Sequence, residues 1–161
     1  MIRHGFLLVE RGAQVCRACC VWLLRNGSMK KEKQTVLAVD DDPEWLDFLS
    51  RTIGTEYHVL SASDGEDAVC MARREVPDVI ILDVIMAGGK DGFTVFAELR
   101  NNPITSKIPV IMFTDANLKS GLSFDSGVMK RQLGKAPAAF LEKSVSPKRL
   151  LSAIKKALRV L

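Results

Sequence analysis

From residue 35 onward, short apolar runs alternate along the chain with longer segments in which apolar residues recur at every third or fourth position. Short apolar runs bounded by turn-forming residues are typical of strands, and the three-to-four spacing is typical of helices that bury one side. Because successive residues in the runs are apolar, we expect the strands to be covered on both faces. The pattern predicts strands at residues 35–39, 57–62, 78–83, 108–114 and 138–142.

Helices are predicted in the segments between these strands and after the last of them. Asp42 precedes the first helix and Ser146 the last, both as N-cap residues, with Pro147 at the first helical position. Gly54 ends the first helix. The segment between the fourth and fifth strands has poor helical periodicity and predicts a short or shifted helix. The remaining pattern predicts helices at residues 43–54, 64–76, 92–101 and 146–161.

Strand and helix alternate about five times, which predicts an α/β fold. The expected architecture is a doubly wound, five-stranded parallel sheet with helices on both faces. In such sheets, ligands bind in the crevice beyond the carboxyl ends of the strands. The polar side chains that follow the strands are therefore the first candidates for a functional site.

The composition of the 161-residue chain, 47% apolar and 26% charged, is ordinary for one globular domain. No apolar run approaches the roughly 18 residues of a membrane span, so we expect no membrane partner. The net charge of +4 belongs to the first 33 residues, which hold seven Lys or Arg against two Glu. The remainder holds sixteen basic and seventeen acidic residues, so the charge gives no reason to expect a nucleic-acid partner.

Residues 1–33 are predicted to form an N-terminal extension outside the fold, and residues 34–161 the folded domain. The stretch before Met29 does not read as a signal peptide, because Arg17 interrupts its apolar part and no A-x-A-like site follows. Met29 opens a short charged lead into the first strand, as a natural start would. The alternative is an amphipathic helix, residues 6–24, that docks onto a partner or onto the domain.

The four cysteines point to no metal or redox centre. Cys16 and Cys19 form half of a zinc site at most, because no second pair follows. Cys70 is expected on the apolar side of the second helix, as a buried structural thiol. Nothing in this cysteine usage requires an oxidising compartment, and we expect a cytoplasmic protein.

Four strands are followed by side chains of complementary chemistry. Asp40 and Asp41 follow the first strand, Asp83 ends the third, Thr114 ends the fourth and Lys143 follows the fifth. Three carboxylates that meet repel one another unless a cation lies among them. Mg²⁺ suits a site with few oxygen ligands and often bridges carboxylate to phosphate. With a hydroxyl and an ammonium added, the set can hold a phosphoryl group on a carboxylate.

Taken in order, the motifs VLAVDDDP, PDVIILDVIM, DGFTVFAELR, IPVIMFT and FLEKSVSPKRLL resemble the receiver domain of two-component response regulators. The resemblance covers nearly all of residues 34–161. It implies a flavodoxin-like fold with strand order 2-1-3-4-5. It also implies a histidine kinase or a histidine phosphotransfer protein as the phosphoryl donor.

The same resemblance assigns roles to individual residues. It implies that Asp83 is the phosphoacceptor, and that Asp40, Asp41 and Asp83 hold Mg²⁺ together with the backbone carbonyl of Ile85.

On the other side of the acceptor, the resemblance implies that Thr114 binds a phosphoryl oxygen. It implies that Lys143 pairs with the phosphate. Phe140, three residues before that lysine, matches the aromatic residue that switches with the threonine.

Three positions depart from the pattern of this family. Ala87 replaces a proline in the turn after the acceptor, and that turn has one extra residue. Asp115 stands where the family has a small residue, which predicts slower phosphorylation by small donors. Ser144 stands where the family has a proline after the lysine, so we expect a trans peptide bond there.

We expect a stand-alone receiver, with no output domain after Leu161, that catalyses only its own phosphorylation and slow dephosphorylation. It would signal through protein–protein contacts and is not a metabolic enzyme. One alternative is a phosphorylation-independent pseudo-receiver that acts as a scaffold. A flavodoxin-like cofactor carrier would need hydroxyls and glycines where the first loop has three aspartates. An aspartyl phosphatase would need a second carboxylate where Ile85 stands.

Overall fold

The structure, a computed structural model, describes residues 33–87, 89–115 and 136–159. The elements in these ranges are β1 Thr35–Val39, α2 Pro43–Ile53, β2 His58–Ala62, α3 Gly65–Glu75, β3 Val79–Asp83, α4 Gly92–Asn101, β4 Val110–Thr114, β5 Ala139–Glu142 and α6 Pro147–Leu158. Each predicted strand and helix in this part of the chain is confirmed, with small shifts at the ends. The leader and the helix expected between β4 and β5 lie outside the described residues.

All five strands are parallel and lie in the order β2-β1-β3-β4-β5. The predicted sheet and its strand order are confirmed. The chain moves to one side of β1 to form β2 and then crosses to the other side to form β3. The reversal lies between β1 and β3, and doubly wound proteins bind their ligands beyond the carboxyl ends of the strands at such a point.

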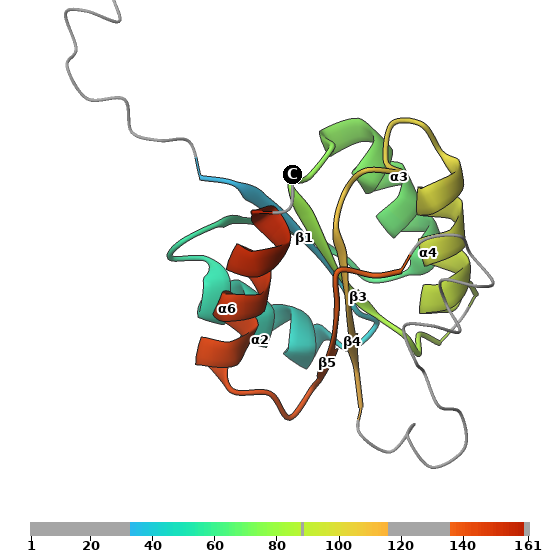
Figure 1. The fold of residues 1–161 in the computed structure, drawn as a ribbon. Coiled ribbons are helices and arrows are strands. Elements are labelled where there is room, and N and C mark those ends of the chain that lie inside the picture. The colour runs from blue at the N-terminus through green and yellow to red at the C-terminus, as the bar shows by residue number, and fades with distance from the viewer. Residues whose placement is uncertain (1–32, 88, 116–135, 160–161) are drawn as a thin grey trace, which may run out of the picture. The chain divides into compact units, whose positions relative to one another are not determined.

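Of the helices that the structure describes, α2 and α6 lie on one side of the sheet and α3 and α4 on the other (Figure 1). Side chains of β1 alternate between the two layers, because successive residues of a strand point to opposite faces. Val36 and Ala38 belong to the core under α2 and α6, and Leu37 and Val39 to the core under α3 and α4. All five residues of β3 are buried, which explains its uninterrupted apolar run.

The helix ends follow the expected capping chemistry with one exception. The Asp42 carboxylate accepts a hydrogen bond from the backbone N–H of Glu44 at 2.8 Å, and Gly54 is the C-cap of α2. Ser146 occupies the N-cap position of α6 as predicted, but its side chain makes no capping hydrogen bond. Among the described residues, no helix is long and apolar enough to cross a membrane.

The prediction of a buried Cys70 is wrong, because the side chain is exposed. Helix α3 buries Gly65, Ala68, Val69 and Ala72; Ala68 and Val69 lie three and four positions after Gly65, and Ala72 one turn further on, so the four form one stripe. A residue directly after Val69 is turned by about 100° around the helix axis and points away from the sheet.

Val76 adopts a left-handed backbone conformation at the end of α3, with φ of 45° and ψ of 62°. A β-branched side chain is strained there, whereas Asn tolerates this region. Because Val76 is 52% exposed, its replacement loses little burial. We expect Val76→Asn to raise the free energy of unfolding by about 1 kcal/mol, measured by urea denaturation. Ile104→Asn, an equally exposed control without positive φ, should bring no gain; a less stable Val76→Asn would contradict the argument.

Candidate functional site

Three carboxylates meet at the carboxyl ends of β1 and β3. Asp40 follows β1 and Asp83 ends β3, and the two strands pair in parallel, with Val39 opposite Leu82. Asp40, Asp41 and Asp83 each offer one carboxylate oxygen, and these oxygens all lie within 4.8 Å of one another. Asp40 is 0% exposed and Asp83 4%, whereas Asp41 is exposed. The sheet topology therefore brings together the acids that the sequence singled out.

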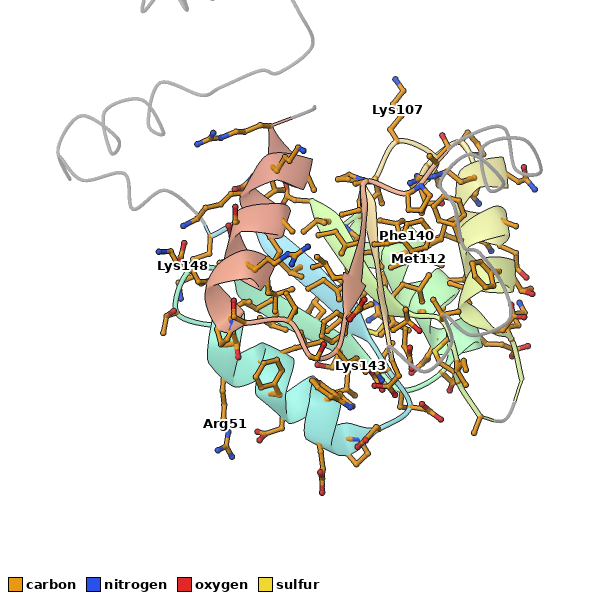
Figure 2. The ribbon with its side chains drawn as sticks, turned by 60° about the horizontal axis from the view of Figure 1, so that its bottom comes forward. Arg51, Lys107, Met112, Phe140, Lys143 and Lys148 are labelled. Carbon is orange, nitrogen blue, oxygen red and sulfur yellow. The ribbon has the colours of Figure 1, made fainter. Side chains whose placement is uncertain are left out.

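Lys143 reaches into this acidic cluster from the segment after β5. Its Nζ lies 2.8 Å from Asp40 Oδ2 and 3.0 Å from Asp83 Oδ2, and its side chain is 6% exposed. Its backbone N–H donates to the carbonyl oxygen of Thr114 at 2.8 Å, which holds the lysine against the end of β4. Figure 2 shows Lys143 beyond β5, on the side of the sheet where α2 lies.

One ammonium faces three carboxylates in this cluster, which we call the acidic pocket. Burial raises the pKa of Asp40 and of Asp83, although Lys143 acts in the opposite direction. Burial disfavours the charged form of Lys143, but the hydrogen bonds and charges of Asp40 and Asp83 outweigh it and raise the pKa of the ammonium. The acidic pocket thus holds more negative than positive charge, and a further cation would reduce the repulsion between its carboxylates.

The acidic pocket fits a hard divalent cation. Its donors are carboxylate oxygens, two from buried residues and one from the exposed Asp41, which leaves one side open to water ligands. Few protein oxygens completed by water are what Mg²⁺ prefers. Ile85 is 55% exposed and stands two residues after Asp83; the use of its backbone carbonyl as a ligand stays a prediction.

Thr114 and Phe140 lie in different surroundings. Thr114 ends β4 beside the pocket, and its Oγ1 is buried without a hydrogen-bond partner among the described residues. A buried hydroxyl of this kind is available to a ligand, because leaving it unpaired costs free energy. Phe140 pairs with Met112 in the sheet, and Figure 2 shows both side chains on the face that α4 covers. The role of Phe140 as a switch stays a prediction.

Asp41 also ties the pocket to the loop that follows β3. Its Oδ2 accepts a hydrogen bond from the backbone N–H of Ala87 at 2.7 Å. Within the same loop, Asp83 Oδ1 accepts from the N–H of Val84 at 2.6 Å. Sequence reasoning missed the contact between Asp41 and Ala87, because a backbone donor leaves no signature in residue type.

Three of the residues that depart from the expected pattern lie on the surface. Ala87, Asp115 and Ser144 are all exposed. The peptide bond before Ser144 is trans, as predicted. The effect of Asp115 on small donors stays a prediction.

A family model described as the response regulator receiver domain matches residues 36–155. The chain belongs to this family. Response regulator PleD of Caulobacter vibrioides is 44% identical over 80 residues, which are 49% of this chain and 17% of PleD. The receiver therefore corresponds to a small part of that longer relative.

Solved receiver structures share the fold. Chemotaxis protein CheY4 of Vibrio cholerae matches with a TM-score of 0.65 and 29% identity, over 80% of this chain and 99% of CheY4. The receiver domain of sensor histidine kinase PA1611 from Pseudomonas aeruginosa matches with a TM-score of 0.66 and 22% identity, over 79% of this chain and 98% of that one. Its structure has a magnesium ion coordinated in the active site cleft. At this identity the second match shows the fold alone.

One more side chain of this receiver, that of Trp45, contacts the ammonium of the acidic pocket. The ring of Trp45, in α2, lies over Lys143, with Nζ 5.3 Å from the ring centroid. The sequence places Trp45 on the buried side of α2 but does not show which cation it meets.

Gly92, the first residue of α4, lets the helix approach the end of β3 closely. Its N–H donates to the carbonyl oxygen of Val84 at 2.9 Å. An added Cβ would overlap the backbone oxygen of Asp83 and lie 2.8 Å from Val84 Cα, and backbone atoms cannot rotate away.

We expect Gly92→Ala to lower the free energy of unfolding by about 2 kcal/mol, because the overlap forces a backbone shift next to Asp83. Urea denaturation measures the loss, and amide NMR shifts should locate the disturbance at Asp83 and Val84. Thr94→Ala, an exposed change in the same helix, serves as the control. Equal stability of Gly92→Ala and the unchanged protein would contradict the close packing.

Proposed function

We propose that Asp83 accepts a phosphoryl group in a Mg²⁺-dependent reaction, and that the receiver passes on its phosphorylation state through protein–protein contacts. The observation that supports this most is the acidic pocket, in which three carboxylates lie within 4.8 Å of one another and two of them, Asp40 and Asp83, pair with the buried ammonium of Lys143. The family implies a histidine kinase or a histidine phosphotransfer protein as the donor. Because such donors act inside the cell, the proposal places the receiver in the cytoplasm.

Asp40, Asp41 and Asp83, with the backbone carbonyl of Ile85, are the residues that would hold Mg²⁺. When bound, the ion supplies positive charge between the carboxylates and the phosphoryl oxygens. The three carboxylate oxygens within 4.8 Å of one another support a hard divalent cation of this kind.

The transfer itself uses three side chains. An Asp83 carboxylate oxygen attacks phosphorus, the bond from phosphorus to the donor's histidine nitrogen breaks, and that nitrogen keeps the electron pair. Lys143, which already lies 3.0 Å from Asp83 Oδ2, would turn from the carboxylate to the new phosphoryl oxygens. The free hydroxyl of Thr114 would donate to a phosphoryl oxygen.

Three alternatives compete with this proposal. The pseudo-receiver interpretation rests on the changes at Ala87, Asp115 and Ser144, yet these three residues are exposed and the four pocket side chains are present. A carrier of a phosphate-containing cofactor would meet carboxylates in place of a phosphate cradle. A phosphatase would need an acid at Ile85.

The function is tested by incubating the full chain with acetyl phosphate, with Mg²⁺ and with EDTA, and measuring the intact mass. The proposal predicts the gain of one phosphoryl group with Mg²⁺ and none with EDTA. No gain with either acetyl phosphate or a phosphorylated histidine phosphotransfer protein would favour the pseudo-receiver.

We further propose that residues 34–161 fold as the receiver domain without residues 1–33. Among the residues that the structure describes, the strands and the two core clusters lie between Thr35 and Leu158. A chain that begins at Met29 is expected to keep the melting temperature and the phosphorylation rate of the full chain. A melting temperature lower by several degrees would show that the leader packs on the domain.

A further inference from the structure

Aromatic contacts on both sides hold the indole of Trp45 in one orientation. Trp45 is half-buried in the first turn of α2. Its ring makes edge-to-face contacts with Phe48 at 5.4 Å and 85°, and with Phe113 at 5.6 Å and 83°. Phe113 is fully buried in β4 and lies opposite Asp83 in the sheet register. The two aromatic contacts therefore fix the indole relative to β4 and to Asp83 of β3.

The face of this fixed ring meets the buried ammonium of the acidic pocket. Lys143 Nζ lies 5.3 Å from the Trp45 ring centroid, within the range of cation–π attraction. The same Nζ lies 2.8 Å from Asp40 and 3.0 Å from Asp83. Two carboxylates and one aromatic face thus surround the ammonium, and the attraction is strengthened because little water reaches it.

A lysine needs such support because its four-carbon stem is flexible and its charge is strongly hydrated. Asp40 and Asp83 hold the ammonium at 2.8 and 3.0 Å, while the stem behind it keeps several rotatable bonds. The Trp45 ring, 5.3 Å from Nζ, would keep water from that side of the ammonium and limit the rotamers of the stem.

We infer that Trp45 is a positioning residue of this receiver: it holds the Lys143 ammonium where the phosphoryl group on Asp83 would arrive. The contact itself is independent of the proposed function, whereas its effect on phosphoryl transfer rests on that function. If Trp45 only packed α2 onto the core, a substitution that removes similar packing elsewhere in the same core cluster would slow phosphoryl transfer by the same factor.

The first measurement concerns the lysine alone. NMR of the full chain should show the Lys143 ε-methylene shifted upfield by the indole ring current. Trp45→Leu should abolish this shift and increase the mobility of the lysine stem in relaxation measurements. Trp45→Phe should keep part of the upfield shift and part of the restriction on the stem. Leu151→Ala, which removes packing from the same core cluster on α6, should change neither. Absence of the upfield shift in the unchanged protein would overturn the inference.

The second measurement concerns the reaction. Trp45→Leu is expected to slow labelling by acetyl phosphate at saturating Mg²⁺ about tenfold, as loss of one desolvated cation–π contact would. Trp45→Phe and Leu151→Ala should stay within about threefold of the unchanged rate. Equal slowing by Trp45→Leu and Leu151→Ala, or no slowing by either, would overturn the positioning role.

Two outcomes of these measurements call for a further variant or readout. If Trp45→Leu does not fold, a fluorinated tryptophan in a Trp22→Phe background weakens the cation–π attraction without changing the ring's shape, and labelling should slow as fluorine is added. Constant rates across that series would overturn the inference. If the unchanged protein is not labelled at all, the proposed function fails, and the mobility of Lys143 alone then decides for or against positioning by Trp45.

Discussion

An Asp83→Asn variant is expected to gain no phosphoryl group from acetyl phosphate, under conditions in which the unchanged receiver gains one. Asp83 ends β3 inside the acidic pocket, with one carboxylate oxygen 3.0 Å from Lys143 Nζ and the other bonded to the N–H of Val84. An amide oxygen at this position carries no full negative charge and cannot form a stable bond to phosphorus. The loss should therefore be complete, as measured by intact mass.

The matched control is Asp78→Asn, at the opposite end of the same strand. Asp78 Oδ2 accepts a hydrogen bond from the N–H of Thr35 at 2.7 Å, and an Asn side chain can replace that acceptor. Asp78→Asn should be labelled like the unchanged receiver. Labelling of a folded Asp83→Asn variant would show that another side chain is the acceptor.

Removing the buried ammonium with Lys143→Met should give the largest change in stability. Asp40 and Asp83, both almost fully buried, would then face each other with no cation between them. Breaking a buried ion pair from one side typically costs about 3 kcal/mol, which we expect in urea denaturation with EDTA. Saturating Mg²⁺ should recover much of this loss and bind more tightly to the variant, because the competing ammonium is gone.

The loss should also depend on pH. Burial raises the pKa of Asp40 and Asp83 above the ordinary value of 3.8, so the folded chain holds these protons more tightly than the unfolded chain. Ionisation of either acid therefore lowers stability as pH rises above that value. Without Lys143 the effect grows, and the loss in Lys143→Met should be larger at about pH 7 than at about pH 5. Against the effect of burial, the hydrogen bonds and charges of Asp40 and Asp83 raise the pKa of Lys143, so its ammonium stabilises the fold at about pH 5 and at about pH 7 in the unchanged protein. That stabilisation is lost only at high pH.

Lys155→Met provides the control for a lysine on the surface. Lys155 pairs with Glu56 at 2.8 Å, but the two side chains are 51% and 41% exposed. Exposed ion pairs contribute at most about 1 kcal/mol to the free energy of unfolding, so Lys155→Met should lose no more than that. Mg²⁺ should not change the loss. Equal losses in the two variants, or a loss in Lys143→Met that Mg²⁺ leaves unchanged, would contradict the account of the acidic pocket.

The sequence by itself determined the order of elements, the layers of the sheet and the candidate acceptor. Apolar periodicity reports which faces of each element are buried, so the uninterrupted run before Asp83 already indicates a central parallel strand. The sequence also predicted helix capping from residue type, since Asp42 caps α2 as expected. The error at Cys70 came from assigning one residue to a helix stripe, where a step of a single position turns a side chain from the core to solvent.

The contacts that give the pocket its chemistry were decided only by the tertiary structure. Lys143 and Asp83 are sixty residues apart in the chain, and their separation of 3.0 Å depends on how far β3 and β5 extend before they turn. The bond from Ala87 to Asp41 depends on a backbone direction, and the ring of Trp45 over Lys143 on the angle of α2. Periodicity along a chain reports burial but carries neither distance nor direction between segments, which only packing of the whole sheet fixes.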